Sequence, residues 1–453
     1  MNEKYDYIIL GTGLTECILS GLLSVENKKV LHLDKNDYYG GESASLSLSQ
    51  IYNRFFPGQD MPLCLGNDRS WSIDLIPKFI IANGELSHIL YYTGVTRYLD
   101  FKVISGSFVY KDKKIAKIPT TDMEAVRSSL MNIFEKRRMK KFLEFIYNYK
   151  EDDPSTHQSL DLDSHSMNDV YSKFNLEEST KEFIGHAMAL YLDDSYLTQP
   201  ARETYKRILL YITSVSLYGK SPYIYPLYGL GDLPQSFARH FFLFVFFFII
   251  YFRLSAVYGG TYMLNRHVDE IVYENGLAVG IKSEGEIAYA SKIIADPSYF
   301  PDRVYKTGKV IRVICILNHP IPNTGDLDSL QIVIPQSQVK RKHDIYIVMV
   351  SSVHNVCPKG YFLAIVSTIV ETNNPHIEVK PGLDLLEPIL EKFITITDIL
   401  EPMNTNKDNI FISKSYDATS HFETTTNDVK RIYFEAEEKE LIITQKSAII
   451  ENE

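Results

Sequence analysis

The N-terminal region has apolar and glycine-rich segments in the order strand, turn, helix, strand. Residues 5–10 are a short apolar run, residues 14–23 have a helical composition, and residues 29–34 again have a strand pattern. Gly11 and Gly13 lie in the turn, and Asp34 ends the second strand, where dinucleotide folds carry a ribose-binding acid. The pattern predicts a βαβ dinucleotide unit, with a plain glycine turn as the alternative.

The turn departs from the dinucleotide pattern at its third glycine position, which Glu16 occupies. A glycine there lets the helix pack closely on the strand. A carboxylate suits the positive end of the helix dipole, but it would fill the pyrophosphate site and repel the phosphates. We therefore predict a degenerate dinucleotide turn made by Gly11, Gly13, Glu16 and Asp34, with no bound cofactor.

The middle of the chain, residues 121–221, has the apolar spacing of helices. Met139, Phe142 and Ile146 share one face of such a helix, beside the basic residues Arg137, Arg138, Lys140 and Lys141. Serine followed three residues later by an acid, at Ser166 and at Ser179, predicts two further helix starts, and Gly219 predicts a helix end. This region reads as an all-helical domain.

Strand patterns return after residue 222, for example at residues 310–317 and 361–370. An α/β domain interrupted by a helical one explains this order. We predict a flavoprotein-like α/β fold of residues 1–120 and 222–435 with a β-rich completion, an inserted helical domain of residues 121–221, and a flexible tail of residues 436–453.

A Phe-rich segment, residues 240–253, breaks this pattern with the uninterrupted apolar stretch Phe241–Phe252. As a helix the stretch would be roughly 18 Å long, short of the ~30 Å hydrocarbon core of a bilayer. Its residue types have T-rich codons, so a retained intron in the gene model is the preferred interpretation. A real aggregation-prone strand or a membrane-touching element is the alternative.

Composition narrows the function classes. The chain has 453 residues, a net charge of −10 and a pI near 5.7, which disfavours nucleic acid as a partner. Its four cysteines lack the spacing of a metal site, and its charged N-terminus differs from a signal peptide. We expect a cytosolic protein without its own membrane anchor.

Several strings resemble those of the Rab GDP-dissociation inhibitors, a family related to the Rab escort proteins. They are residues 11–17, 38–42, 74–79, 134–138, 219–223 and 416–418, and the similarity extends from Tyr5 to Tyr433 outside the Phe-rich segment. The resemblance implies a non-enzymatic carrier on a flavin-oxidase-like scaffold. Such a carrier binds one geranylgeranylated Rab GTPase in its GDP state, inhibits GDP dissociation, extracts the Rab from membranes and recycles it for vesicular transport.

The resemblance also assigns roles to individual residues. The Rab-binding platform corresponds to Tyr39, Arg69, Asp232, Thr261 and Met263, with Arg239 or Arg253 as a further arginine. The helical domain is expected to house the prenyl lipid, with Met139, Phe142, Phe183, Ile184, Ala187, Met188, Ile208, Leu209 and Ile212 as candidates or as ordinary core residues. A mobile effector loop that engages membrane-associated partners corresponds to Tyr218, Gly219, Lys220, Ser221, Pro222 and Tyr223.

Three positions depart from the family pattern. Asp232 replaces a glutamate, Leu217 replaces an arginine, and the Phe-rich segment is inserted between Asp232 and Met263. Two other functions fit parts of the sequence. A Rab escort protein would be longer, and an FAD-dependent oxidase is disfavoured by Glu16 and by the lack of a reaction centre.

Overall fold

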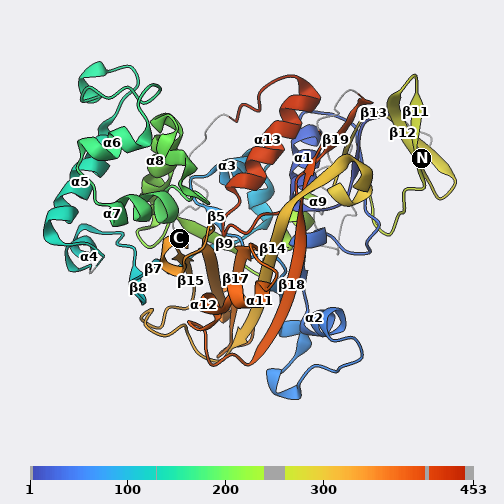
Figure 1. Ribbon diagram of the computed structural model, residues 1–453. Coiled ribbons are helices and arrows are strands. Elements are labelled where there is room, and N and C mark those ends of the chain that lie inside the picture. Colours follow the sequence, from blue (N-terminus) through green and yellow to red (C-terminus); the bar gives the residue numbers. More distant parts are fainter. Residues whose placement is uncertain (1–3, 129, 239–260, 404–407, 444–453) are drawn as a thin grey trace, which may run out of the picture.

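The computed structural model describes residues 4–128, 130–238, 261–403 and 408–443. Two large sheets and the helices around them make the α/β body, and a group of helices lies to one side of it (Figure 1). Arg239, Arg253 and the predicted Phe-rich insertion lie outside the described residues.

The first sheet contains the N-terminal βαβ unit. Its strands run in the order β10, β2, β1, β13, β12, β11, with β19 added beside β13, and β1 is parallel to both β2 and β13. These strands are β1 (Lys4–Leu10), β2 (Val30–Leu33), β10 (Thr261–Met263), β11 (Glu270–Glu274), β12 (Leu277–Ser283), β13 (Glu286–Ala295) and β19 (Ile410–Ile412). The predicted strand, turn, helix and strand at the N-terminus are thus confirmed.

The second sheet is mostly antiparallel and carries the β-rich completion. Its order is β18, β14, β17, β16, β15, β7, β8, and only β7 and β15 pair in parallel. The strands are β7 (Gly106–Lys111), β8 (Lys114–Lys117), β14 (Val304–Leu317), β15 (Leu330–Ile334), β16 (Ile345–Ser351), β17 (Phe362–Ile369) and β18 (Glu391–Pro402). Two small sheets join β3 (Ser45–Leu46) to β4 (Ile73–Asp74), and β9 (Tyr223–Pro226) to β5 (Ile80–Ile81) and β6 (Phe101–Val103).

Helix α1 is buried on every side, which explains its apolar sequence. It packs against α9 and α13, and Gly21 lets it approach Phe237, because a Cβ there would lie 2.6 Å from the Phe237 ring. The helices of the body are α1 (Leu14–Val25), α2 (Leu48–Phe55), α3 (Glu85–Tyr92), α9 (Asp232–Ala238), α11 (Pro375–Glu378), α12 (Lys380–Leu383) and α13 (Glu423–Glu437).

The helical unit follows β8 and ends before β9, so it is inserted between two strands of the body. Its helices are α4 (Asp122–Arg127), α5 (Ile133–Asn148), α6 (Met167–Lys173), α7 (Glu178–Glu182), a π-helix (Phe183–Met188) and α8 (Ala201–Tyr218). The capping box of Ser166 and Asp169 is confirmed, and Gly219 ends α8 in the left-handed conformation with φ of 67°.

The helix start predicted at Ser179 is wrong. The N-cap of α7 is Glu177, whose backbone N–H donates to Oε1 of Glu135 on α5 at 2.8 Å. A tertiary contact therefore sets this helix start in place of a local capping box.

The C-terminal tail is attached to the body for part of its length. Leu441 and Ile443 pack against the same core as α1, and Lys439 lies 2.8 Å from a carboxylate oxygen of Glu26. The expected flexible tail from residue 436 therefore does not describe residues 436–443. Within the described ranges, no helix combines the length and the apolar composition that crossing a bilayer requires.

Candidate functional site

Asp34 holds the glycine turn in place. Thr12 donates to Oδ2 of Asp34 from its backbone nitrogen at 2.6 Å and from its hydroxyl at 2.5 Å. Asn36 donates to Oδ1 from its backbone at 2.8 Å and from its side chain at 2.9 Å. Because Asp34 is buried and both of its oxygens are engaged, the acid at the ribose position serves the turn itself.

Glu16 fills the mouth of the turn. Its side chain is buried in the first turn of α1 and folds back over Gly13, where a Cβ would lie 2.5 Å from Oε2 of Glu16. The Ser413 hydroxyl donates to Oε1 at 2.5 Å. Beside it, the Tyr416 hydroxyl accepts the backbone N–H of Leu14 at 2.9 Å, one of the N–H groups that a phosphate would use at a helix N-terminus.

Burial changes the charge that we expected at Glu16. Desolvation, reinforced by the nearby Asp296 carboxylate, raises the pKa of Glu16 to about 8. The carboxyl is therefore mostly neutral at pH 7. The position of the side chain over Gly13 adds a steric block to the predicted repulsion of phosphate.

Tyr39 lies near the edge strand of the first sheet, β10, which carries Thr261 and Met263. Strand β10, which carries Thr261 and Met263, pairs in parallel with β2, and all three platform candidates are half-buried. The Tyr39 ring centre lies 6.2 Å from that of Tyr262 on β10. Tyr39 thus neighbours Tyr262, whereas Met263 packs with Leu31 and Leu33 against the core cluster on the other face of the sheet.

Tyr262 is the neighbour of Tyr39 on β10, and it was not among the residues predicted from the sequence. Its ring centre lies 4.3 Å from that of His32 on β2, and its hydroxyl donates to Ser20 on α1 at 2.9 Å. The alternation of a strand already indicates an inward side chain between Thr261 and Met263. That signal was available in the sequence.

Asp232 is the first residue of α9 and follows a loop fixed by Asp74. The backbone N–H of Leu230 donates to Oδ1 of Asp74 at 2.9 Å, and that of Gly231 donates to the Ser45 hydroxyl at 2.7 Å. Ser45 lies in the same connection as Tyr39, so the Asp232 loop is tied to the segment that carries Tyr39.

Arg69 is exposed on a separate loop. The indole of Trp71 donates to the carbonyl oxygen of Leu65 at 3.0 Å, and Ser72 donates to the carbonyl of Tyr228 at 2.5 Å. This loop is therefore anchored to the one that precedes Asp232.

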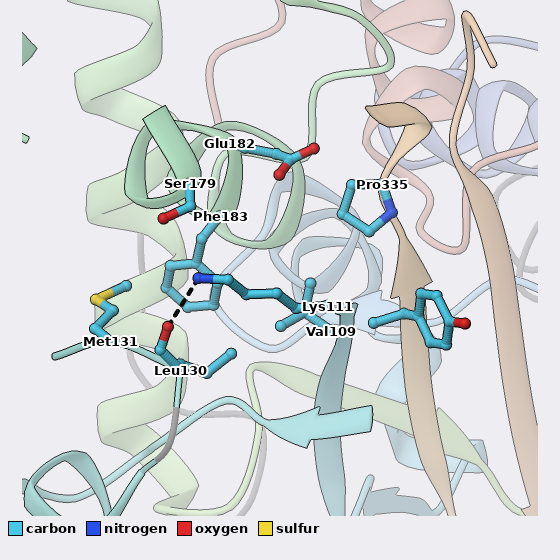
Figure 2. A pocket seen from close by; sticks show the side chains of 9 residues that line it. Val109, Lys111, Leu130, Met131, Ser179, Glu182, Phe183 and Pro335 are labelled. Carbon is cyan, nitrogen blue, oxygen red and sulfur yellow. Dashed lines mark hydrogen bonds between the residues drawn. The ribbon is translucent and has the colours of Figure 1, made fainter. Parts of the chain in front are cut away.

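The prenyl-lipid candidates form the closed core of the helical unit. Leu209 and Ile212 are half-buried, and the other seven are buried, namely Met139, Phe142, Phe183, Ile184, Ala187, Met188 and Ile208. A small pocket beside Phe183 has a volume of about 10 Å³, room for roughly one water molecule. Figure 2 shows Leu130, Met131 and Phe183 around Lys111, which donates to the carbonyl oxygen of Leu130 at 3.0 Å.

A buried histidine fixes this core to the body. His186, in the π-helix, contacts Asp344 before β16 at 2.8 Å and Asp194 at 3.1 Å. Burial alone lowers the pKa of His186, but hydrogen bonds to Asp194 and Asp344 outweigh it and raise the pKa to about 10. The imidazolium therefore clamps the helical unit to the second sheet, a contact that no sequence pattern indicates.

The predicted mobile effector loop is short and anchored at both ends. Tyr218 ends α8, Tyr223 begins β9, and Ser221 is buried and donates to the carbonyl oxygen of Ile104 at 2.7 Å. Pro222 is also buried, so only Gly219 and Lys220 of the six residues are exposed. The neighbouring Leu217, at the family's arginine position, is half exposed.

Comparison with known proteins places the chain in one family. The family model described as GDP dissociation inhibitor matches residues 1–448. The probable secretory pathway GDP dissociation inhibitor 1 of Schizosaccharomyces pombe is 60% identical over 98% of this chain and 99% of its own length. The Rab GDP-dissociation inhibitor of Saccharomyces cerevisiae is 58% identical over 98% of each chain.

Solved structures agree with this placement. The Rab GDI of Plasmodium falciparum has a TM-score of 0.91 and 47% identity, and the match covers 98% of this chain and 100% of that one. An oxidoreductase of Methanosarcina mazei has a TM-score of 0.58 at 13% identity over 95% and 99% of the two chains, which shows a shared oxidoreductase-like fold alone. The chain belongs to the GDP dissociation inhibitor family.

Proposed function

We propose that this protein is a carrier of Rab GTPases. It binds geranylgeranylated Rab in the GDP state, inhibits GDP dissociation and extracts the Rab from membranes for recycling in vesicular transport. It works without catalysis as a monomer bound to one Rab, and it cycles between the cytosol and membranes. The match of the family along nearly the whole chain carries this proposal, since one relative is named a Rab GDP-dissociation inhibitor and one solved structure a Rab GDI.

The blocked dinucleotide turn supports a carrier over an oxidase. Glu16 occupies the space over Gly13, and Asp34 is engaged by Thr12 and Asn36. A flavin pyrophosphate needs that space and those backbone donors. The scaffold is thereby freed for binding a protein.

A prenyl tail leaves a membrane only for an equivalent apolar site, because each buried CH₂ is worth about 0.8 kcal/mol. The core of the helical unit offers such side chains, and Leu209 and Ile212 lie at its half-exposed border. In this proposal the core opens to admit the lipid, since the pocket beside Phe183 has room for only about one water molecule.

The platform provides the nucleotide specificity. In this proposal Tyr39, beside Tyr262, and the strand that carries Thr261 and Met263 contribute to the contact with Rab at this edge of the sheet. A surface that fits the switch regions in the GDP conformation stabilises that conformation and slows nucleotide release.

An extraction assay tests the proposal. Vesicles carrying prenylated Rab loaded with GDP are incubated with the purified chain, and released Rab is measured in the supernatant. We expect release in a one-to-one complex and slower loss of a fluorescent GDP. Equal release of Rab loaded with a non-hydrolysable GTP analogue, or unchanged GDP loss, would refute the proposal.

A further inference from the structure

Helix α5 has an unusual solvent face. Ile133 and Phe134 in its first turn are exposed, Phe134 to 66%. The next turns expose Arg137, Lys140 and Lys141 on the same side. The helix thus presents apolar side chains followed by a basic surface.

The preceding helix α4 extends the apolar part. Met123 is exposed, and Val126 is exposed to 72%. Lys136 of α5 donates to the carbonyl oxygens of Val126 at 2.8 Å and Ser128 at 2.6 Å, which holds the end of α4 against the start of α5. We call this surface, made of Met123, Val126, Ile133, Phe134, Arg137, Lys140 and Lys141, the α4–α5 face.

The charge of the α4–α5 face opposes that of the whole chain, whose net charge is −10. Acidic groups of α5 are partly neutralised within the helix. Glu135 is buried and pairs with Arg138 at 3.0 Å, and Glu144 lies 3.9 Å from Lys140. The exposed positive charges of Arg137, Lys140 and Lys141 outnumber the negative charge of the exposed Glu144, so the surface is basic.

The far end of the helix carries an aromatic side chain. Tyr147 is exposed, one helical turn beyond Glu144 on the side that carries Arg137 and Lys140. Exposed aromatic and apolar side chains can enter the headgroup boundary of a bilayer, and basic residues beside them are attracted to acidic lipids. A protein partner is less consistent with this face, because lysine is depleted at protein interfaces.

The α4–α5 face adjoins the lipid candidates. Leu130 and Met131, which connect α4 to α5, line the small pocket together with Phe183 of the helical core (Figure 2). A bilayer that contacts the face would therefore lie next to the residues proposed to receive the prenyl tail.

We propose that the α4–α5 face docks the protein on bilayers that contain acidic phospholipids. The apolar side chains enter the headgroup region, and Arg137, Lys140 and Lys141 bind the acidic headgroups. A role of this contact in Rab extraction rests on the proposed carrier function. The binding of the chain alone to vesicles is independent of that function.

The test is flotation of the purified full chain, without Rab, on vesicles of phosphatidylcholine with or without phosphatidylserine. We expect binding only with phosphatidylserine and weaker binding at high salt. The triple variant R137E/K140E/K141E should bind at least about tenfold more weakly, since each basic side chain near an anionic surface contributes about fivefold. The variant I133A/F134A should also bind more weakly.

The control variant K4E/K309E/K359E reverses three exposed lysines outside the helical unit. It changes the net charge by the same amount as R137E/K140E/K141E. Its vesicle binding should stay near that of the wild type. All variants keep residues 239–260, so any vesicle binding by the Phe-rich segment is the same in each. Equal melting temperatures exclude unfolding as the cause.

The inference is overturned by three results: no binding to either vesicle, equal binding to both vesicles, or equal losses in the α4–α5 and matched variants. Failure of the carrier function has a different signature, since the wild-type chain would then bind vesicles without extracting Rab. In a working carrier, R137E/K140E/K141E should slow extraction while binding of unprenylated Rab·GDP is unchanged.

Discussion

At the residue scale, the glycine turn could be predicted from the sequence, whereas the protonation state of Glu16 in that turn could not. Gly11, Gly13 and Glu16 are neighbours in sequence, so their place in a disabled turn was predictable. The neutral state of Glu16 was not, because it depends on burial beneath Ser413, which is 397 positions away. Local patterns identify a turn, whereas its protonation depends on the whole fold.

The variant Glu16→Gln tests this burial. The folded pKa of Glu16 is raised from 4.5 to about 8, so its ionisation opposes folding increasingly as pH rises above 4.5, up to about 8. Relative to wild type, the variant should gain roughly 3 kcal/mol of unfolding free energy between pH 5 and pH 8. Denaturant titrations at several pH values measure this difference. A difference that does not change with pH would show that Glu16 is ionised in the native state.

Tyr39→Ala tests the platform. Removal of an aromatic anchor should weaken binding of prenylated Rab·GDP by roughly 1–3 kcal/mol. Tyr289→Ala is a suitable control, because Tyr289 is a partly exposed tyrosine on β13 of the same sheet. Titration calorimetry or fluorescence gives both affinities. Equal affinities for the two variants would remove Tyr39 from the platform.

At the element scale, the helices of the inserted unit were predictable from their spacing, but their joints were not. The capping box at Ser166 is local and was found, whereas the start of α7 depends on Glu135 of another helix. The π-helix and its clamp at His186 depend on Asp344, 158 residues away. Long-range contacts of this kind leave no periodic pattern.

His186→Asn tests the clamp. The pKa of His186 is raised from 6.5 to about 10, so its stabilisation is complete below pH 6.5 and is lost as pH rises through 10. The variant should lose roughly 3–5 kcal/mol of unfolding free energy below pH 6.5, since Asp344 is left buried without a counter-charge. The loss should shrink toward pH 10.

The control for this measurement is His343→Asn. His343 pairs with Glu371 at 3.0 Å but is partly exposed, so its removal should cost at most about 1 kcal/mol. Similar losses for the two variants below pH 6.5 would contradict the clamp.

At the scale of the whole molecule, the discontinuous α/β body and the inserted helical unit followed from the change between strand and helix periodicity. The pairing of strands did not, for example β7 beside β15 or β13 between β1 and β12. Which residues form one surface depends on that pairing. The position of Tyr39 beside the strand that carries Thr261 and Met263 is therefore a result of the structure, although resemblance had assigned the residues.

Ile212→Glu tests whether the helical unit binds the prenyl lipid while the α/β body binds the Rab protein. Ile212 is half-buried at the edge of the helical core, far from the platform strand in sequence. The variant should impair extraction of prenylated Rab several-fold and leave binding of unprenylated Rab nearly unchanged. Ser216→Glu, an exposed position of the same helix, is the matched control. Equal loss of both activities in Ile212→Glu would indicate general misfolding.

The buried core of the helical unit also affects the solubility of the protein after it has released a Rab. A carrier with a preformed apolar groove would expose that groove to water, and to other unloaded carriers, after each release of a Rab. Here Phe142, Ile184 and Ile208 are fully buried in one core cluster, so their apolar side chains are covered by the protein itself. In the proposed cycle, burial of these side chains after the lipid leaves favours release of the Rab. It also keeps the unloaded carrier from aggregating.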